Sequence, residues 1–236
     1  FHEFDSTHDD LVNISVKNHY HGLDNEVAHI RKDVSFDKAK SGFMVADPLT
    51  LYDCCPTSDG ASCVILAADH VVSQFTDDPV WIKSSAAASD YLALHDRPSI
   101  TQLMATQKAA KRAYSMAGIS AKDVDIAEVH DCFTIAELFA TEDLGFSERG
   151  TGGQFARENR GRRNEGTTCI NPSGGLKSKG HPLGATGTGQ TVEIFKQLRN
   201  EVESTRQVRD ANIGLSHNVG GSGATCSIHV YGRDRD

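Results

Sequence analysis

The sequence lacks any apolar run approaching the ~20 residues that a membrane-spanning helix requires. It is poor in cysteine, with six in 236 residues, and has no CxxC pair, which argues against a disulfide scaffold. It also lacks a basic surplus, because 24 Lys and Arg stand against 32 Asp and Glu, a formal charge of -8. That charge disfavours nucleic acid as a partner. These absences predict a soluble globular protein of a reducing, cytoplasmic compartment.

The chain also lacks a recognisable start. Its first residues, Phe-His-Glu-Phe, contain neither an initiator methionine nor a signal sequence, so we expect a truncated or processed beginning. The length is sufficient to bury a large core. No internal repeat or low-complexity linker occurs, and the one shift in composition lies near residues 69–78. We therefore expect the end of one domain followed by one whole domain.

Hydrophobic patterning predicts strands alternating with helices, which is typical of an α/β sheet covered by helices. The uninterrupted apolar run from Ala61 to Ala68 predicts a strand buried on both faces. The last two strands, joined across NVGGSG, predict a hairpin at the end of the sheet, and residues 145–180 a long Gly- and Arg-rich loop. Further strands are expected over 80–89, 125–130, 211–216 and 224–231, and helices over 9–19, 99–118, 133–144 and 184–199.

The segment EVHDCFT, residues 128–134, ends a predicted strand and turns directly into a predicted helix. A thiol in the first turn of a helix lies at the positive end of the helix dipole, so we expect the pKa of Cys132 to fall. Neighbouring His130 can exchange a proton with it, and ligands of open α/β sheets gather at the carboxyl ends of strands. Both are candidate catalytic residues. The alternative is a buried, inert cysteine beside a capping Asp131.

The segment CINPSGGLKSKGHPLGATGTGQT, residues 169–191, is rich in glycine and precedes a predicted helix. Glycine lets backbone approach a ligand and present N–H groups to an anion, so Ser173, Gly174 and Gly175 are candidate cofactor-binding residues. It is not a phosphate-binding loop, because His181 and a proline stand where Lys and Ser or Thr are required. His181, held between glycine and proline, is a candidate catalytic residue. The alternative is a plain tight turn.

The segment LSHNVGGSGA, residues 215–224, places His217 before a glycine-rich hairpin. Adjacent backbone N–H groups in such a turn can form an oxyanion hole. Taken by itself, this segment favours a simple glycine-rich hairpin turn. Backbone around Asn218, Gly220 and Gly221 supplies the candidate oxyanion donors.

No metal site is expected. His19-x-His21 is the one close histidine pair, and no cysteine or carboxylate stands at ligand spacing to complete it. Basic residues of the acidic chain gather between 157 and 179, where they either attract an anionic cofactor tail or form a solvated loop. They are Arg157, Arg160, Arg162, Arg163, Lys177 and Lys179.

Together, HDCF at 130–133, NPSGGLKSKGHPLGATG at 171–187 and HNVGGSG at 217–223 occur in the order found in the thiolase family. The sequence most closely resembles the branch that contains sterol-carrier-protein type and archaeal thiolases. The segments VKNHYHG at 16–22 and ADPLTLYDCCPTSDGAS at 46–62 also resemble that branch. The likeness therefore covers nearly the whole chain.

This resemblance implies a thiolase-like α/β fold, in which two similar halves pack mixed sheets around shared central helices, usually in a homodimer or tetramer. Residues 1–70 would be the loop region and last strand of the N-terminal half, and residues 71–236 the C-terminal domain. The implied substrates are acyl-CoA and coenzyme A, with no covalently bound cofactor.

The resemblance also implies roles for single residues. His181 of the GHP motif would activate the nucleophile and help to bind a thioester oxygen, and His130 would line the same oxyanion hole through water. Many thiolases carry an acid/base cysteine in a CxG motif where this sequence has His217 followed by Asn and Val. In the HDCF branch Cys132 takes that role. His217 stays among the catalytic candidates, and backbone near Gly220 would complete a second oxyanion hole.

The nucleophilic cysteine of thiolases lies in the first half, whereas Cys54, Cys55 and Cys63 match the last strand region of that half. The resemblance thus implies a component of a thiolase-type acyl-CoA C-acyltransferase, inactive until a missing or separate N-terminal half supplies the nucleophile. It would catalyse thiolytic cleavage of 3-oxoacyl-CoA or Claisen condensation. Two alternatives stay open: a thiolase-like aldolase acting on side-chain acyl-CoA, and a non-catalytic CoA-binding subunit. Some relatives use a zinc-ribbon and OB-fold partner protein, for which the 145–180 loop is a candidate interface.

Overall fold

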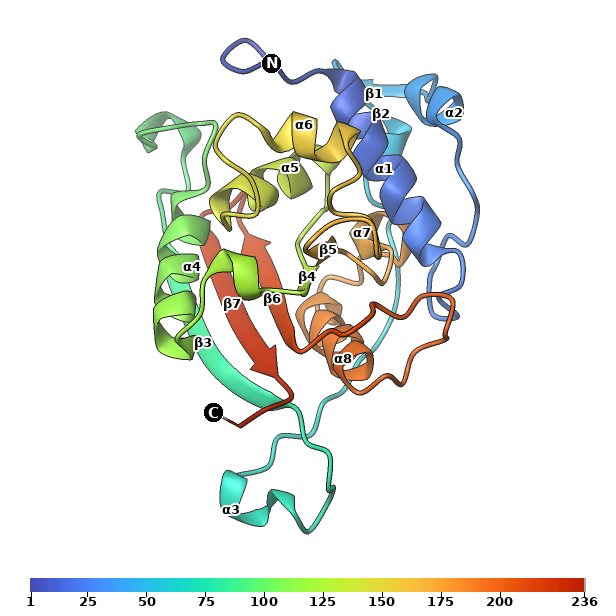
Figure 1. Cartoon of the computed structure of the whole chain (residues 1–236). Helices are drawn as coiled ribbons and strands as arrows, with labels where there is room; N and C mark the ends of the chain where they lie inside the picture. The colour runs from blue at the N-terminus through green and yellow to red at the C-terminus, as the bar shows by residue number, and fades with distance from the viewer. Residues whose placement is uncertain (236) are drawn as a thin grey trace.

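A five-stranded mixed sheet lies at the centre of the computed structural model, which describes residues 1–235 (Figure 1). The strand order is β3-β7-β6-β4-β5; β7 is antiparallel to both neighbours, and β4 is parallel to β6 and β5. The strands are β3 (Trp81–Ser89), β4 (Ile126–Glu128), β5 (Cys169–Ile170), β6 (Ile213–Gly220) and β7 (Thr225–Gly232). The helices beside them are α4 (Met104–Ala117), α5 (Thr134–Asp143), α6 (Gly152–Arg157), α7 (Gly175–Ser178) and α8 (Thr186–Leu198).

Helices cover both faces of this sheet because successive strand residues point to opposite sides. Ile126 of β4 packs in one cluster with Ile194 of α8. Its neighbour Ala127 packs in the other cluster, with Ala109 of α4 and Ala140 of α5. The predicted α/β class, a mixed sheet with covering helices, is confirmed.

The first eighty residues form helices and short strands beside the sheet rather than strands within it (Figure 1). The helix predicted over 9–19 is present as the longer α1 (His8–Gly22), whose first turn is closed by Asp10 accepting from the Thr7 N–H at 2.8 Å. Helix α1 packs against α5, α6 and α7. The smaller elements of this region are α2 (Phe36–Lys40), β1 (Met44–Ala46), β2 (Leu49–Thr50), a 3₁₀ turn at Leu51–Asp53 and α3 (Asp69–Val72). Two further 3₁₀ turns, at Leu94–Asp96 and Ala121–Asp123, lie later in the chain.

The prediction of a doubly buried strand at Ala61–Ala68 is wrong for this chain. The segment has no strand partner among residues 1–235, and Ile65 and Leu66 are 89% and 73% exposed. It leads into α3, which extends away from the body of the molecule at the bottom of Figure 1. A strand is stable only where a neighbour completes its hydrogen bonds, and the described part of the chain supplies none here.

Three other expectations needed correction. The helix predicted from Ser99 begins at Met104, although its end is correct because Gly118 adopts the left-handed conformation at φ 67°. Residues 145–180 are not an unbroken loop, since they contain α6, β5 and α7. The β6–β7 hairpin lies inside the sheet rather than at its end, because β3 pairs with the outer side of β7.

Candidate active site

Three predicted histidines from separate segments meet near the carboxyl end of β4. The rings of His130 and His181 lie edge to face with centroids 4.9 Å apart. The backbone N–H of His130 donates to Nδ1 of His217, on β6, at 3.5 Å. The fold therefore brings together the HDCF, GHP and HNV motifs, as the resemblance implied.

His181 is held in one tautomer by Thr186 at the start of α8. The Thr186 hydroxyl donates to the Pro182 carbonyl at 3.0 Å, so its oxygen accepts the N–H of His181 Nδ1, at 2.8 Å. A neutral imidazole protonated at Nδ1 has a free lone pair at Nε2. Burial, and then the charge of Lys179, lower the pKa of His181. At neutral pH, Nε2 of His181 is therefore a proton acceptor.

His130 and His217 are neutral as well. Burial, and then His181, lower the pKa of His130 to about 4; burial, and then His130, lower that of His217 to about 3. Since Nδ1 of His217 accepts from backbone, its Nε2–H donates to the Thr106 hydroxyl at 3.0 Å. His217 is 0% exposed, and both its ring nitrogens are used inside the protein. By contrast, the buried Nδ1 of His130 has no hydrogen-bond partner within residues 1–235.

Cys132 does not have the lowered pKa that the sequence predicted. Burial, and then the neighbouring Asp131, raise the pKa of its thiol to about 11. The expectation is wrong because α5 begins only at Thr134, so Cys132 lies before the first turn. The carbonyl of Cys132 accepts from the Cys55 N–H at 3.0 Å, which joins the HDCF turn to the N-terminal segment. At neutral pH the thiol is protonated.

The sequence offered Asp131 as a cap for α5, the helix that follows it. In the structure Asp131 instead accepts from the first turn of α7. Its buried carboxylate accepts from the Leu176 N–H of α7 at 2.7 Å and from the Asn18 side chain of α1 at 2.8 Å. The added Cβ of any residue at Gly175 would lie 2.4 Å from an oxygen of this carboxylate. The residue beside the candidate cysteine therefore anchors the glycine-rich segment.

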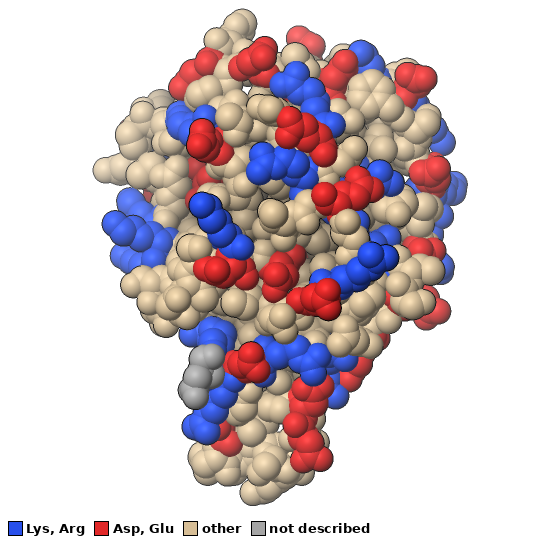
Figure 2. Space-filling model, viewed as in Figure 1, with Lys and Arg blue, Asp and Glu red and all other residues tan. Residues whose placement is uncertain are grey.

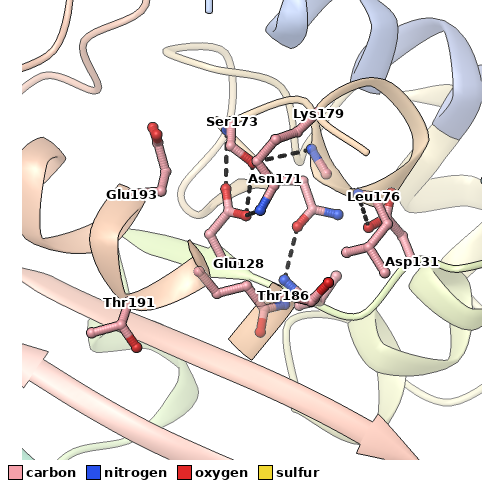
Figure 3. A network of polar contacts seen from close by, with 12 residues as sticks. Glu128, Asp131, Asn171, Ser173, Leu176, Lys179, Thr186, Thr191 and Glu193 are labelled. Carbon is pink, nitrogen blue, oxygen red and sulfur yellow. Dashed lines mark hydrogen bonds and ion pairs between the residues drawn. The ribbon is translucent and has the colours of Figure 1, made fainter. Parts of the chain in front are cut away.

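The predicted cofactor-binding residues Ser173, Gly174 and Gly175 are buried. Figure 3 shows Ser173 within a network of polar contacts. Ser173 donates from its N–H and hydroxyl to Glu128 at 3.0 and 2.8 Å. The Gly174 N–H donates to the Asn171 carbonyl at 2.9 Å, and the Gly175 N–H to the Ser173 hydroxyl at 3.2 Å. All three N–H groups therefore have acceptors inside the protein. Coenzyme A binding by these residues stays a prediction.

The candidate oxyanion residues of the β6–β7 hairpin are more accessible. Gly220 and Gly221 are exposed, and Asn218 is half-buried with its amide donating to Gln190 at 3.2 Å. Arg97 braces the turn by donating to the Ser222 carbonyl at 2.9 Å. Their role as oxyanion donors stays a prediction.

The basic residues between 157 and 179 do not form one patch. Lys177 is buried and donates to the Cys54 carbonyl, Arg163 is buried, and Arg157 pairs with Asp10 at 3.0 Å. Acidic and basic side chains alternate over the face shown in Figure 2. Among residues 1–235 no group of three His, Cys, Asp or Glu side chains is placed to hold a metal ion. No helix in that range is long and apolar enough to cross a membrane.

Sequence reasoning missed the residues that hold the candidates in place. Thr106 lies in no motif, and Thr186 lies within the segment 171–187 but was not singled out there. Glu128 and Lys179, 3.9 Å apart between Oε2 and Nζ, were also overlooked as a pair. A signal was present for Glu128, because a carboxylate inside the apolar strand sequence IAEV requires a buried partner.

The profile of the thiolase C-terminal domain-like family matches residues 86–233. The chain belongs to the thiolase family. It is 47% identical over 232 residues to an acetyl-CoA acetyltransferase from Methanothermobacter thermautotrophicus, covering 98% of this chain and 60% of that one. It is also 39% identical to sterol carrier protein 2 from Oryctolagus cuniculus, covering 94% of this chain and 41% of that protein. The chain thus spans 60% and 41% of the lengths of these two relatives.

Solved structures share the fold. A structure described as an Ltp2-ChsH2(DUF35) aldolase superposes with a TM-score of 0.88 at 23% identity, covering 100% of this chain and 61% of that one. The SCP2-thiolase like protein type 1 from Mycobacterium smegmatis gives 0.71 at 15% identity, covering 96% and 46%. The predicted membership of the thiolase family and its fold are confirmed.

Proposed function

We propose that this chain is the C-terminal component of a thiolase-type acyl-CoA C-acyltransferase. The observation that carries the proposal is the meeting of His130 and His181, 4.9 Å apart, beside a turn that contains Cys132. In the proposal, residues 71–236 are the C-terminal domain, and residues 1–70 complete an N-terminal half that supplies the nucleophilic cysteine. The identity to acetyl-CoA acetyltransferases supports acyl-CoA and coenzyme A as its substrates.

His181 acts first in this scheme. The free lone pair at its Nε2 takes the proton of the nucleophilic thiol, which attacks the 3-oxo carbon of the substrate. His130 is neutral and has an unpartnered Nδ1, which suits it to an oxyanion site reached through water. Both ring nitrogens of His217 form hydrogen bonds inside the protein, with the His130 backbone and with Thr106. We therefore assign His217 a positioning role.

Cys132 then serves as the acid of the thiolytic direction. Cleavage of the C–C bond leaves a carbanion on the departing acetyl-CoA, and a proton must reach that carbon. A thiol with a pKa of about 11 holds its proton at neutral pH, which is the state this step needs. In the proposal, backbone N–H groups at Gly220 and Gly221, which are exposed, stabilise the enolate oxygen.

The N-terminal segment supports a split active unit. The apolar residues of Ala61–Ala68 are exposed and unpaired within residues 1–235. A sheet of the N-terminal half would bury them, with a gain of about 1.5–3 kcal/mol for each large side chain. A homodimer or tetramer and a zinc-ribbon partner also belong to the proposal; the aldolase with the same fold is titled as a pair with a DUF35 partner.

Thiolysis of acetoacetyl-CoA by free CoA tests this function. The chain should be assayed alone and with every polypeptide that co-purifies with it from its source, each identified by intact mass. We expect no cleavage by the chain alone, cleavage in the complete preparation, and a loss of about 10²–10⁴-fold in His181→Ala. Absence of thioester cleavage in the complete preparation, or activity unchanged in His181→Ala, would overturn the proposal.

The second candidate is a thiolase-like aldolase. It is favoured by the TM-score of 0.88 over the whole chain with a structure titled as an aldolase. An aldolase needs no acyl-enzyme, so the two functions separate in one measurement. A mass increase equal to an acyl group on any cysteine, after mixing with 3-oxoacyl-CoA, supports the thiolase; carbon–carbon cleavage without such an adduct supports the aldolase.

A further inference from the structure

A basic groove lies between α4 and the outer edge of the sheet, and no candidate site residue lines it. The groove encloses about 640 Å³. Lys108, Lys111 and Arg112 line its α4 side, and residues 85–87 of β3 line the other. No Asp or Glu among residues 1–235 lines this groove, although the chain as a whole carries a formal charge of -8. The groove is therefore a local reversal of the charge of the protein.

The three cations lie together because of their spacing on α4. Positions 108, 111 and 112 are related as i, i+3 and i+4, which places them on one face of a helix. All three side chains are exposed, and no acidic residue occurs anywhere in α4. Figure 2 shows basic side chains gathered at the left edge of the molecule, over α4. An anionic group entering the groove therefore meets cations that no carboxylate of this helix neutralises.

The other wall of the groove is the free edge of β3, which is the outermost strand of the sheet. The Asp90 N–H donates to the Ala224 carbonyl, beside β7, at 2.7 Å. Backbone groups of successive residues in an antiparallel strand point to opposite sides, so those of Ala87 point away from β7. The Ala87 carbonyl accordingly accepts from the Arg112 guanidinium at 3.0 Å. Ser85 and Ala87 thus present N–H groups that lack a strand partner within residues 1–235.

The edge of β3 is open to another strand. Residues 84–89 are serine and alanine only, so no bulky or charged side chain of this stretch blocks an approaching backbone. Natural sheets usually protect such an edge by covering it or by placing charges on it. In this protein the charges lie beside the edge, on α4. A second copy of the chain would bring its own three cations to the same groove, so repulsion disfavours that occupant and favours an acidic one.

We propose that this groove docks an acidic, extended peptide segment of another protein, which adds as a sixth strand beside β3. Its backbone pairs with Ser85 and Ala87, and every second side chain faces α4. Those side chains repeat about every 6.8 Å along a strand, whereas Lys108 and Arg112 are about 6 Å apart along the helix axis. Acidic residues at alternate positions therefore match the cations. This inference is independent of the acyl transfer proposed above.

Binding of a synthetic peptide to the chain tests the proposal. The probe is the fluorescein-labelled peptide Thr-Glu-Val-Glu-Val-Glu-Thr, and its matched control carries Gln in place of each Glu. By fluorescence anisotropy we expect the acidic peptide to bind at least about tenfold more tightly than the control, because several exposed ion pairs are lost together. In ¹⁵N-labelled protein, the acidic peptide should slow hydrogen exchange at the amides of Ser85 and Ala87, because strand addition pairs them.

Two protein variants separate the roles of charge and backbone. Lys108→Glu combined with Lys111→Glu should weaken peptide binding at least about tenfold. Lys32→Glu combined with Lys38→Glu makes the same charge change at exposed positions in and before α2, and should alter the affinity by less than about twofold. The variant Ala87→Pro removes one outward N–H, which an edge strand tolerates, and should also weaken binding. Melting temperatures establish that each variant is folded; the Ser85 exchange measurement carries the backbone test if the proline variant is not.

The proposal is overturned by equal binding of the acidic and Gln peptides, by unchanged exchange at Ser85 and Ala87, or by full affinity in the Lys108→Glu and Lys111→Glu protein. Oligothymidylate that displaces the peptide and binds more tightly would assign the groove to nucleic acid instead. Sedimentation showing a dimer that the same double variant dissociates would assign it to a second copy. Each of these results stands whether or not the chain takes part in thioester cleavage.

Discussion

The glycine-rich segment 169–180 and the apolar segment 61–68 of this chain differ sharply in burial. Residues 169–180 are almost entirely buried although they carry polar side chains and few large apolar ones. Residues 61–68, which include the run CVILAA, are almost entirely exposed and lack a strand partner in the part of the chain that the structure describes. Composition alone would have assigned burial the other way round.

The two segments differ in burial because only one of them has neighbouring groups that complete its hydrogen bonds. Glu128 and Asp131 accept hydrogen bonds from backbone N–H groups of the 169–180 segment, and Asn171 within it accepts from the Val129 N–H. No side-chain N or O atom of residues 169–180 is buried without a hydrogen-bond partner in the described part of the chain, so burying this polar segment leaves no such atom unpaired. The 61–68 segment needs a neighbouring strand for its backbone and an apolar face for its side chains. The sequence-based rule that apolar runs are buried applies only when the covering surface is available.

The largest effect on this comparison is expected for the substitution Gly175→Ala. Gly175 has φ 58°, and an added Cβ would lie 2.4 Å from the Asp131 carboxylate. We expect a loss of free energy of unfolding on the order of 3 kcal/mol from the left-handed backbone and the forced displacement together. Urea denaturation measures it. Gly184→Ala is the matched control, since nothing lies within 4 Å of its added Cβ; equal losses in both variants would contradict the anchoring role of Asp131.

The next effect concerns pH. Glu128 has a folded-state pKa of about 7 against an ordinary 4.5. As pH rises, the Glu128 carboxyl therefore loses its proton at a lower pH in the unfolded chain than in the folded one. The free energy of unfolding should fall between about pH 4.5 and 7. Glu128→Gln should remove that component, on the order of 2 kcal/mol across the interval. Parallel melting-temperature profiles of wild type and variant from pH 4 to 8 would show it; profiles of identical slope would refute it.

A smaller loss is expected for Ser173→Ala. The Ser173 hydroxyl donates to Glu128 and accepts from the Gly175 N–H, at 2.8 and 3.2 Å, in a fully buried setting. Its removal leaves two buried groups short of a partner and should cost about 1–2 kcal/mol in chemical denaturation. Ser227→Ala, at an exposed position of β7, controls for the change of residue type and should be nearly neutral.

The smallest effect is expected in the exposed segment. Ile65→Ser should change the stability of the isolated chain by less than about 0.5 kcal/mol, because the side chain is 89% exposed. In a complex with the proposed N-terminal half the same variant should weaken assembly, as measured by analytical ultracentrifugation. A large destabilisation of the chain alone would mean that Ile65 is buried by another copy.

Much of the C-terminal part was predictable from local pattern. The strands near 81–89, 126–128 and 213–232 and the helices at 104–117, 134–143 and 186–198 follow the expected order. The His130 and His181 motifs were also found, because glycine, proline and histidine at such positions carry geometry with them. The raised pKa of Cys132 was not predictable, since it depends on burial and on Asp131 rather than on distance from a helix.

By itself, the sequence determined the α/β alternation, the family and the residues that meet in the candidate site. These depend on side-chain type, on periodicity and on short motifs, which are local properties of the chain. Tertiary structure alone decided the place of the hairpin within the sheet, the tautomer of His181 and the protonation of Cys132. It also decided that Glu128 and Lys179 form a pair, because contacts across 51 positions follow from how strands and loops pack together.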